Sequence, residues 1–275
     1  MKSKNYTLTT MPYSLTIGWL YPELMSTYGD RGNIIVLEKR CEWRGISAQV
    51  VNLDKGFNVK LFNDVDILFM GGAQDLQQKI VSDDFSKEKT KAFKKVMDWG
   101  LPGLYICGAY QFLGKYYKEA NGNVIPGLGI LDLRTEHPGE ESERLIGNIV
   151  VEVDLVGLTP TTYEVEERKI EEKHIIVGFE NHGGKTYLGE NLKPFGQVMK
   201  GFGNNGKDKT EGAVYKNSIG TYLHGPILPK NPEIADWLIE KALERKYKKK
   251  IKLKKLDDFL SQKAKKVVLQ KMSSY

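Results

Sequence analysis

The sequence predicts an α/β protein whose mostly parallel sheet is covered by helices. Over the first two-thirds of the 275 residues, short β-rich runs alternate with helical patterns, which is typical of parallel sheets. Hydrophobic residues make up 40% of the chain, enough to fill a core. Beyond Leu128 strand-like runs dominate, so we expect part of the sheet to be antiparallel.

The first half is predicted to run in β-to-α order. A strand over residues 14–20 and a turn at Tyr21-Pro22 precede a helix that begins at Asp30 or Asn33 and is stopped by Gly45. The further elements predicted in this half are strands over 46–53, 66–70 and 103–106 and an amphipathic helix over 87–100.

The second half is predicted to be strand-rich and to end in helices. Strand-like runs cover residues 147–155, 175–180 and 212–223, and the charged stretch 159–174 is expected to be a loop or an extended hairpin. Helical patterns cover 232–246 and 256–270. We therefore expect one domain over 14–247 and a basic, helical C-terminal extension over 248–275.

The net charge of +6 is concentrated at the C-terminal end. Residues 241–275 hold 13 Lys plus Arg against 3 Asp plus Glu, whereas the rest of the chain holds 28 against 32. This basic segment has no interleaved aromatic platform for bases. A solvated helical face explains it better than a nucleic-acid arm, so we expect no DNA or RNA partner.

Two features predict a cytoplasmic protein without a transmembrane segment. The chain has only two cysteines, too few for a disulfide framework, which indicates a reducing compartment. Its first residues lack a signal-peptide pattern, and no apolar stretch approaches the roughly 20 residues needed to cross a bilayer.

Cys107, in the stretch LPGLYICGAYQFLG, is the predicted nucleophile. It falls between a buried strand and a helix that begins near Ala109, where a sharp turn holds a side chain out of the sheet. The N–H of Gly108 can face a developing oxyanion, and Gly71-Gly72, at the end of another strand, can offer a second N–H. Cys41 lies on the apolar face of a helix and is interpreted as a packing residue.

His224, in GTYLHGP, is the predicted acid and base, because it ends a strand and a glycine follows it. The other three histidines, His137, His174 and His182, lie in loop-like or turn segments and are assigned structural roles. The chain has neither HxxxH nor CxxC spacing, so we predict no metal site.

These motifs resemble class I glutamine amidotransferases of the cobyric-acid-synthase-like branch. The resemblance rests on YICGAYQFLG, GTYLHGP and the glycine loop FMGGAQDLQQ. Within that branch, TYGDRGNIIVL, GLGILDL, VGFENHGGKTYLG and GTYLHGPILPKNPEIADWLIEKALERK are similar to the glutaminase subunits of lipid II isoglutaminyl synthases. The similarity covers about residues 14–247 and implies a flavodoxin-like, three-layer fold.

The resemblance implies hydrolysis of L-glutamine through a thioester on Cys107. The Gly108 N–H, with that of Gly71 or Gly72, would hold the tetrahedral oxyanion. His224 would protonate the departing ammonia and then activate water. Arg144, in ESERLIGNI, matches the family position that binds the α-carboxylate of glutamine, and Gln111 would either shape the pocket or serve only as a helix residue.

The resemblance also implies a partner. No GxxxxGK[ST] phosphate loop occurs in the chain, so a separate, ATP-dependent Mur-ligase-like synthetase would activate the acceptor, and ATP and Mg²⁺ would bind there. The implied acceptor is the D-glutamate of the membrane-linked lipid II stem peptide, which becomes D-isoglutamine. A cobyric-acid-type subunit, a free-standing cysteine hydrolase and a non-enzymatic scaffold are the alternatives.

One departure from the commonest class I pattern concerns the residue that orients the histidine. A glutamate usually lies two residues after it, whereas this chain has Pro226. We therefore expect the third residue to come from elsewhere, and His224 to be poorly fixed in the isolated chain. On this interpretation, glutaminase activity is low until a synthetase subunit docks.

Overall fold

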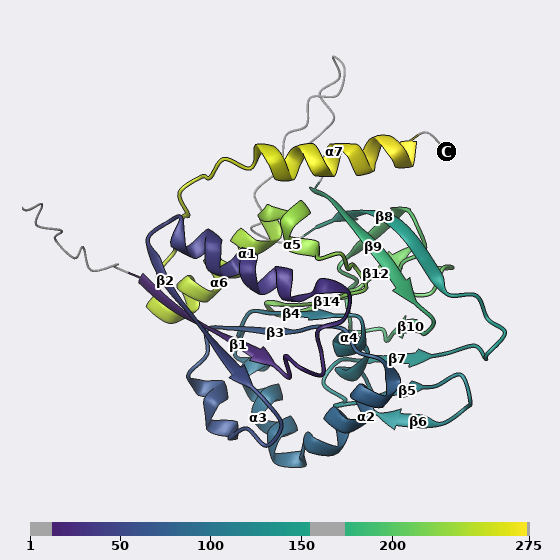
Figure 1. The fold of residues 1–275 in the computed structure, drawn as a ribbon. Coiled ribbons are helices and arrows are strands. Elements are labelled where there is room, and N and C mark those ends of the chain that lie inside the picture. Colours follow the sequence, from purple (N-terminus) through teal and green to yellow (C-terminus); the bar gives the residue numbers. More distant parts are fainter. Residues whose placement is uncertain (1–12, 155–173, 274–275) are drawn as a thin grey trace, which may run out of the picture.

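A mostly parallel, six-stranded sheet forms the centre of the molecule (Figure 1). This computed structural model describes residues 13–154 and 174–273. The strands of the central sheet, in spatial order, are β13 (Ala213–Tyr215), β14 (Ser218–Thr221), β4 (Gly103–Ile106), β3 (Ile67–Met70), β1 (Tyr13–Leu20) and β2 (Ile46–Leu53). Five of these strands are parallel, and only the edge strand β13 runs antiparallel to its neighbour. The predicted α/β class is confirmed.

Helices cover both faces of this sheet. In Figure 1, α1, α5 and α6 lie on one side of it and α2 and α3 on the other. The helical elements are η1 (Thr27–Gly29), α1 (Arg31–Glu42), η2 (Val59–Asn63), α2 (Asp75–Asp84), α3 (Lys87–Asp98), α4 (Gly108–Phe112), α5 (Ile227–Lys230), α6 (Pro232–Tyr247) and α7 (Phe259–Ser273). Among the described residues, no helix is both long and apolar enough to cross a membrane.

Two smaller sheets lie beside the carboxyl ends of the central strands. One contains β5 (Tyr116–Lys118), β6 (Val124–Pro126), β7 (Leu133–Glu136) and β10 (Lys185–Leu188). The other contains β8 (Leu145–Val153), β9 (His174–His182), β11 (Gly196–Lys200) and β12 (Thr210–Glu211). Their pairings are antiparallel except for β5 with β7, as expected for the second half of the chain. Of the predicted loop 159–174, all but His174 lies outside the described residues.

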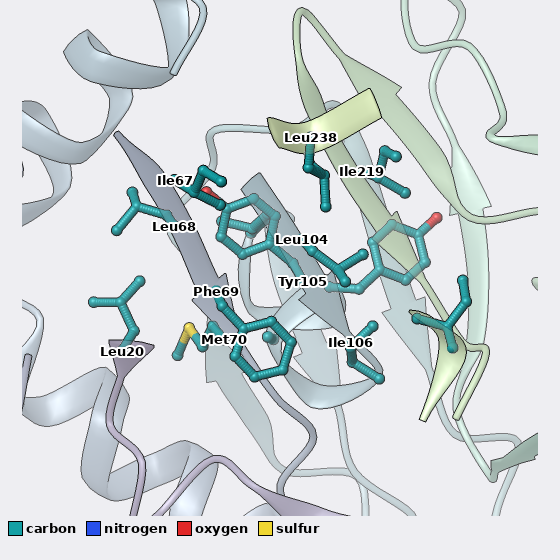
Figure 2. Packing of buried hydrophobic residues seen from close by; sticks show 14 of the residues in the cluster. Leu20, Ile67, Leu68, Phe69, Met70, Leu104, Tyr105, Ile106, Ile219 and Leu238 are labelled. Atoms are coloured by element: carbon teal, nitrogen blue, oxygen red, sulfur yellow. The ribbon is translucent and has the colours of Figure 1, made fainter. Parts of the chain in front are cut away.

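The core is built on the two middle strands, β3 and β4. Every residue of both strands is buried, which is expected where helices cover both faces of a parallel sheet. Figure 2 shows Phe69, Leu104 and Tyr105 packed with residues from neighbouring strands and from α6. Cys41 on α1 is fully buried in this core, and burial raises the pKa of its thiol to about 12. Its predicted packing role is confirmed.

The sequence predicted the central strands well and missed α2. Strands β2 and β4 have the predicted bounds, and β1 and β3 differ from the prediction by one residue at their N-terminal ends. Helix α2 escaped prediction because its sequence, DLQQKIVSDD, has little apolar periodicity. Only Gln78 and Val81 of this helix are buried, and one of these two residues is polar.

Candidate active site

Cys107 occupies a strained turn between β4 and α4. Its φ of 50° and ψ of −105° lie outside the regions that side-chain-bearing residues favour. Backbone bonds hold the turn, because the Cys107 N–H donates to Thr221 O at 2.8 Å and its carbonyl accepts from the Gln111 N–H at 2.9 Å. The strand, turn and helix around Cys107 therefore form the elbow that was predicted from the sequence.

His224 lies at the end of the neighbouring strand and is completely buried. Two backbone hydrogen bonds with Phe179 of β9 fix its main chain. Burial would lower the pKa of its imidazole, but the adjacent Cys107 and Asp30 outweigh burial and raise it to about 10. Both neighbours therefore favour the protonated, imidazolium form of His224.

Asp30 faces the other side of this imidazole. Its Oδ1 lies 3.4 Å from His224 Nδ1, and neither atom has another hydrogen-bond partner among the residues that the structure describes. Its Oδ2 accepts a hydrogen bond from the Gly72 N–H at 2.7 Å. Asp30 is fully buried at the start of α1 and does not cap that helix with its side chain. A buried carboxylate that is free to pair with Nδ1 is the orienting group a catalytic histidine requires.

This position of Asp30 corrects one expectation from the sequence. We expected His224 to be poorly fixed because Pro226 replaces the usual glutamate. In the structure, Pro226 packs against Gly32 of α1, and a Cβ added to Gly32 would come within 2.5 Å of the proline ring. The carboxylate that lies beside His224, that of Asp30, comes from the segment after β1. Sequence analysis considered Asp30 only as a helix start, and its sole signal was its place in the motif TYGDRGN.

The predicted second oxyanion donor also needs correction. The Gly71 N–H donates to Met25 O at 3.1 Å, and the Gly72 N–H donates to Asp30. Within the described residues, the N–H groups of Ala73 and Gly108 make no hydrogen bond. They lie close together, because a Cβ on Gly108 would be 2.9 Å from Ala73 N. The free pair is therefore Gly108, as predicted, and Ala73.

Gln111 forms part of the pocket wall. It is buried, its Nε2 donates to the Tyr222 hydroxyl at 3.1 Å, and its Oε1 accepts from Gln78 Nε2 at 3.0 Å. The side chain lines the pocket with both ends already engaged. This placement fits the pocket-shaping alternative of the sequence analysis better than a helix residue without further role.

Arg144 lies at the pocket mouth, just before β8. Its Nε donates to Asn181 Oδ1 at 2.9 Å and its Nη2 to Asn181 O at 3.0 Å. Asn181 in turn donates to the Tyr28 hydroxyl at 3.2 Å, and the Tyr28 ring stands edge-on to His224 at 5.1 Å. Asn181 and Tyr28 were not singled out from the sequence, because no spacing relates them to Arg144.

A pocket of about 390 Å³ brings these groups together at the carboxyl ends of the parallel strands. Cys107, His224, Arg144, Gln111 and Gly72 all line it.

His182 also reaches this pocket, but in a structural role, as predicted. Its Nδ1 bonds Gly184 O at 2.7 Å, and its ring stacks on Tyr222 at 3.6 Å. Burial lowers the pKa of this imidazole to about 3, so it stays neutral.

Comparison with known proteins identifies the family of the chain. The profile of the CobB/CobQ-like glutamine amidotransferase domain matches residues 16–232. The chain is 45% identical over 234 residues to the GatD subunit of the glutamine-hydrolysing lipid II isoglutaminyl synthase of Staphylococcus aureus, with 85% of this chain and 86% of that protein covered. It is 39% identical to the same subunit of Streptococcus pneumoniae, with 91% and 89% covered.

Two more distant likenesses complete the comparison. A probable cobyric acid synthase of Methanothermobacter thermautotrophicus is 30% identical, over 59% of this chain and 31% of that protein. A solved glutamine amidotransferase of Thermotoga maritima has a TM-score of 0.47 at 15% identity, with 95% of this chain and 99% of that one covered. From the domain match and the two GatD relatives, which confirm the resemblance read from the sequence, the chain is an enzyme that belongs to the CobB/CobQ-like glutamine amidotransferases.

Proposed function

We propose that this chain is the glutaminase subunit of a lipid II isoglutaminyl synthase. It hydrolyses L-glutamine through a thioester on Cys107 and passes the ammonia to a separate synthetase subunit. The observation that carries the proposal is the convergence of Cys107 and His224 in one pocket, with Asp30 buried beside His224, in a chain whose GatD relatives are named for this activity.

The first half-reaction forms the thioester. The Cys107 thiolate attacks the side-chain amide carbon of glutamine, and the carbonyl oxygen becomes an oxyanion held by the N–H groups of Ala73 and Gly108. Collapse of this intermediate breaks the C–N bond. The His224 imidazolium gives its proton to the departing nitrogen, which leaves as ammonia.

The second half-reaction releases glutamate. Neutral His224 removes a proton from water, the water oxygen attacks the thioester carbon, and the C–S bond breaks to restore the thiolate. Throughout the cycle, Asp30 holds Nδ1 of His224 in its protonated form. The other ring nitrogen therefore stays available for proton transfer.

Arg144 selects glutamine by its α-carboxylate. A planar guanidinium pairs with a carboxylate through two parallel hydrogen bonds, and Asn181 already holds one edge of this group in place. Gln111 contributes by shape, since the Tyr222 and Gln78 contacts fix its side chain against the pocket.

The ammonia acceptor is the D-glutamate of the lipid II stem peptide. A Mur-ligase-like partner binds ATP and Mg²⁺, activates this carboxyl group and adds ammonia to form D-isoglutamine. The GatD relatives, named as subunits of such a synthase, support this assignment. The reaction takes place in the cytoplasm, where ATP is available to the partner. The chain acts there in a heterodimer or a larger assembly.

Replacing Cys107 with Ala should abolish glutamine hydrolysis, because no other group in the pocket can form the thioester. Ammonia release by the purified chain measures this loss, and circular dichroism verifies the fold. Cys41→Ala is the matched control, since it removes the other thiol from a buried helix face and should keep the activity of the folded protein. Substantial ammonia release from well-folded Cys107→Ala would contradict the assignment.

Arg144→Ala should raise KM for glutamine far more than it lowers kcat, because the α-carboxylate takes no part in bond breaking. Arg144→Lys keeps the positive charge but loses the planar guanidinium with its two parallel donors. The KM of this variant should therefore fall between those of Arg144→Ala and the wild type. Steady-state kinetics separate the two constants. An unchanged KM with a collapsed kcat would show that Arg144 acts on the reacting centre instead.

Transfer to lipid II can be tested with the complex that co-purifies with the tagged chain from its native cells. Given ATP, Mg²⁺, lipid II and glutamine labelled with ¹⁵N in its amide, the complex should place the label in D-isoglutamine. The complex with Cys107→Ala should lose transfer from glutamine yet keep transfer from ammonium ions. Hydrolysis of glutamine without any labelled stem peptide would instead indicate a free-standing hydrolase.

A further inference from the structure

Side-chain contacts hold the C-terminal helix α7 against the body of the protein, and its opposite face is exposed. Fully buried Lys265 pairs with Glu233 of α6. Just before the helix, Asp258 accepts a hydrogen bond from Arg40 of α1 at 2.6 Å. Arg44 also donates to Lys254 O at 2.7 Å. These bonds set the rotation of α7 about its axis.

The outer face of α7 combines lysines with exposed apolar side chains. Phe259 is 65% exposed, Leu260 77% and Val267 45%. The face consists of Phe259, Leu260, Lys263, Ala264, Lys266, Val267, Gln270 and Lys271, all of them exposed. It carries three positive charges and no negative one. Helices of soluble proteins usually keep their large apolar residues on the buried side. The exposed apolar residues of α7 therefore indicate that this face binds a ligand.

An apolar groove of about 380 Å³ runs beside the start of this face, between α1 and α7. Trp43, which is 60% exposed, and Ile35, which is 46% exposed, line it from α1. Phe259 and Leu260 line it from α7. The outer face of α7 and this groove therefore form one continuous surface, because Phe259 and Leu260 belong to both. Helix α7 lies at the top of the molecule in Figure 1.

We propose that this surface binds an anionic phospholipid membrane. Helices that lie in a membrane interface combine lysines with Phe, Leu and Trp side chains that enter the acyl boundary. Lysines near an anionic leaflet attract it, and exposed Trp43 has the side chain most typical of the interface. The segment from Lys248 to Lys271 has nine exposed lysines besides buried Lys265, against two aspartates, and adds the same charge complementarity.

The composition of this surface favours a membrane over a protein partner. Lysine is depleted at protein interfaces, whereas the outer face of α7 has three lysines among eight residues. The inference goes beyond the proposed function and rests on it at one point. A subunit that supplies ammonia for a lipid-linked acceptor gains from being held at the leaflet that carries the acceptor.

Flotation of the full chain with vesicles tests the proposal. The wild type should bind vesicles of 70% phosphatidylcholine and 30% phosphatidylglycerol, bind pure phosphatidylcholine vesicles weakly, and dissociate in high salt. The triple variant Lys263→Gln, Lys266→Gln, Lys271→Gln should lose on the order of a hundredfold in partitioning. Leu260→Ser with Val267→Ser should also weaken binding, because the apolar contact is lost.

The matched control is the triple variant Lys87→Gln, Lys91→Gln, Lys95→Gln on α3. It removes the same charge from exposed positions across the central sheet and should keep vesicle binding. Equal binding of the wild type to both vesicles, or an equal loss in both triple variants, would overturn the proposal. So would an α7 variant that keeps vesicle binding but loses its co-purifying partner, which would make the surface a protein interface. Ammonia release, measured on the same samples without vesicles, tests the proposed function separately.

Discussion

The active site depends on one buried carboxylate with two tasks. Asp30 Oδ2 accepts the Gly72 N–H, and Asp30 Oδ1 faces His224 Nδ1. The first contact fixes the glycine loop after β3, which places the Ala73 N–H beside that of Gly108. The second raises the pKa of His224 together with Cys107. We propose that Asp30 thereby positions both the base and the oxyanion donors, and that it is a positioning residue without contact to the reacting atoms.

Glycines allow the loop after β3 to lie close to His224 and to the turn at Cys107. A Cβ on Gly72 would lie 3.0 Å from His224 Cε1, and one on Gly108 would lie 2.9 Å from Ala73 N. The sheet supplies the remaining geometry, because β3, β4 and β14 run parallel and end at the same edge. Residues that are distant in sequence therefore meet in one pocket.

The sequence predicted the elements whose signal is local. The β2 and β4 strands have strong β-rich patterns, and Cys107 and His224 each stand at a strand end beside a glycine. Contacts between distant segments could not be predicted from the sequence. No pattern relates Asp30 to His224, and the direction of the N–H groups at Gly71-Gly72 follows from the path of the chain. The pairing with Asp30 thus engages the Gly72 N–H, and Asp30 lies where a third residue from elsewhere was expected.

The central claim is that this chain orients His224 by itself, and the kinetics of Asp30→Asn test it most directly. Asparagine can still accept the Gly72 N–H, but it presents an NH₂ group to Nδ1 and favours the wrong tautomer. Asp66→Asn is the control, because Asp66 is a similarly buried carboxylate that pairs with Lys246 away from the pocket. With the purified chain alone, Asp30→Asn should lower kcat for glutamine hydrolysis by about a hundredfold or more at a nearly unchanged KM, while folded Asp66→Asn keeps its kcat. A wild-type kcat in folded Asp30→Asn would contradict the account.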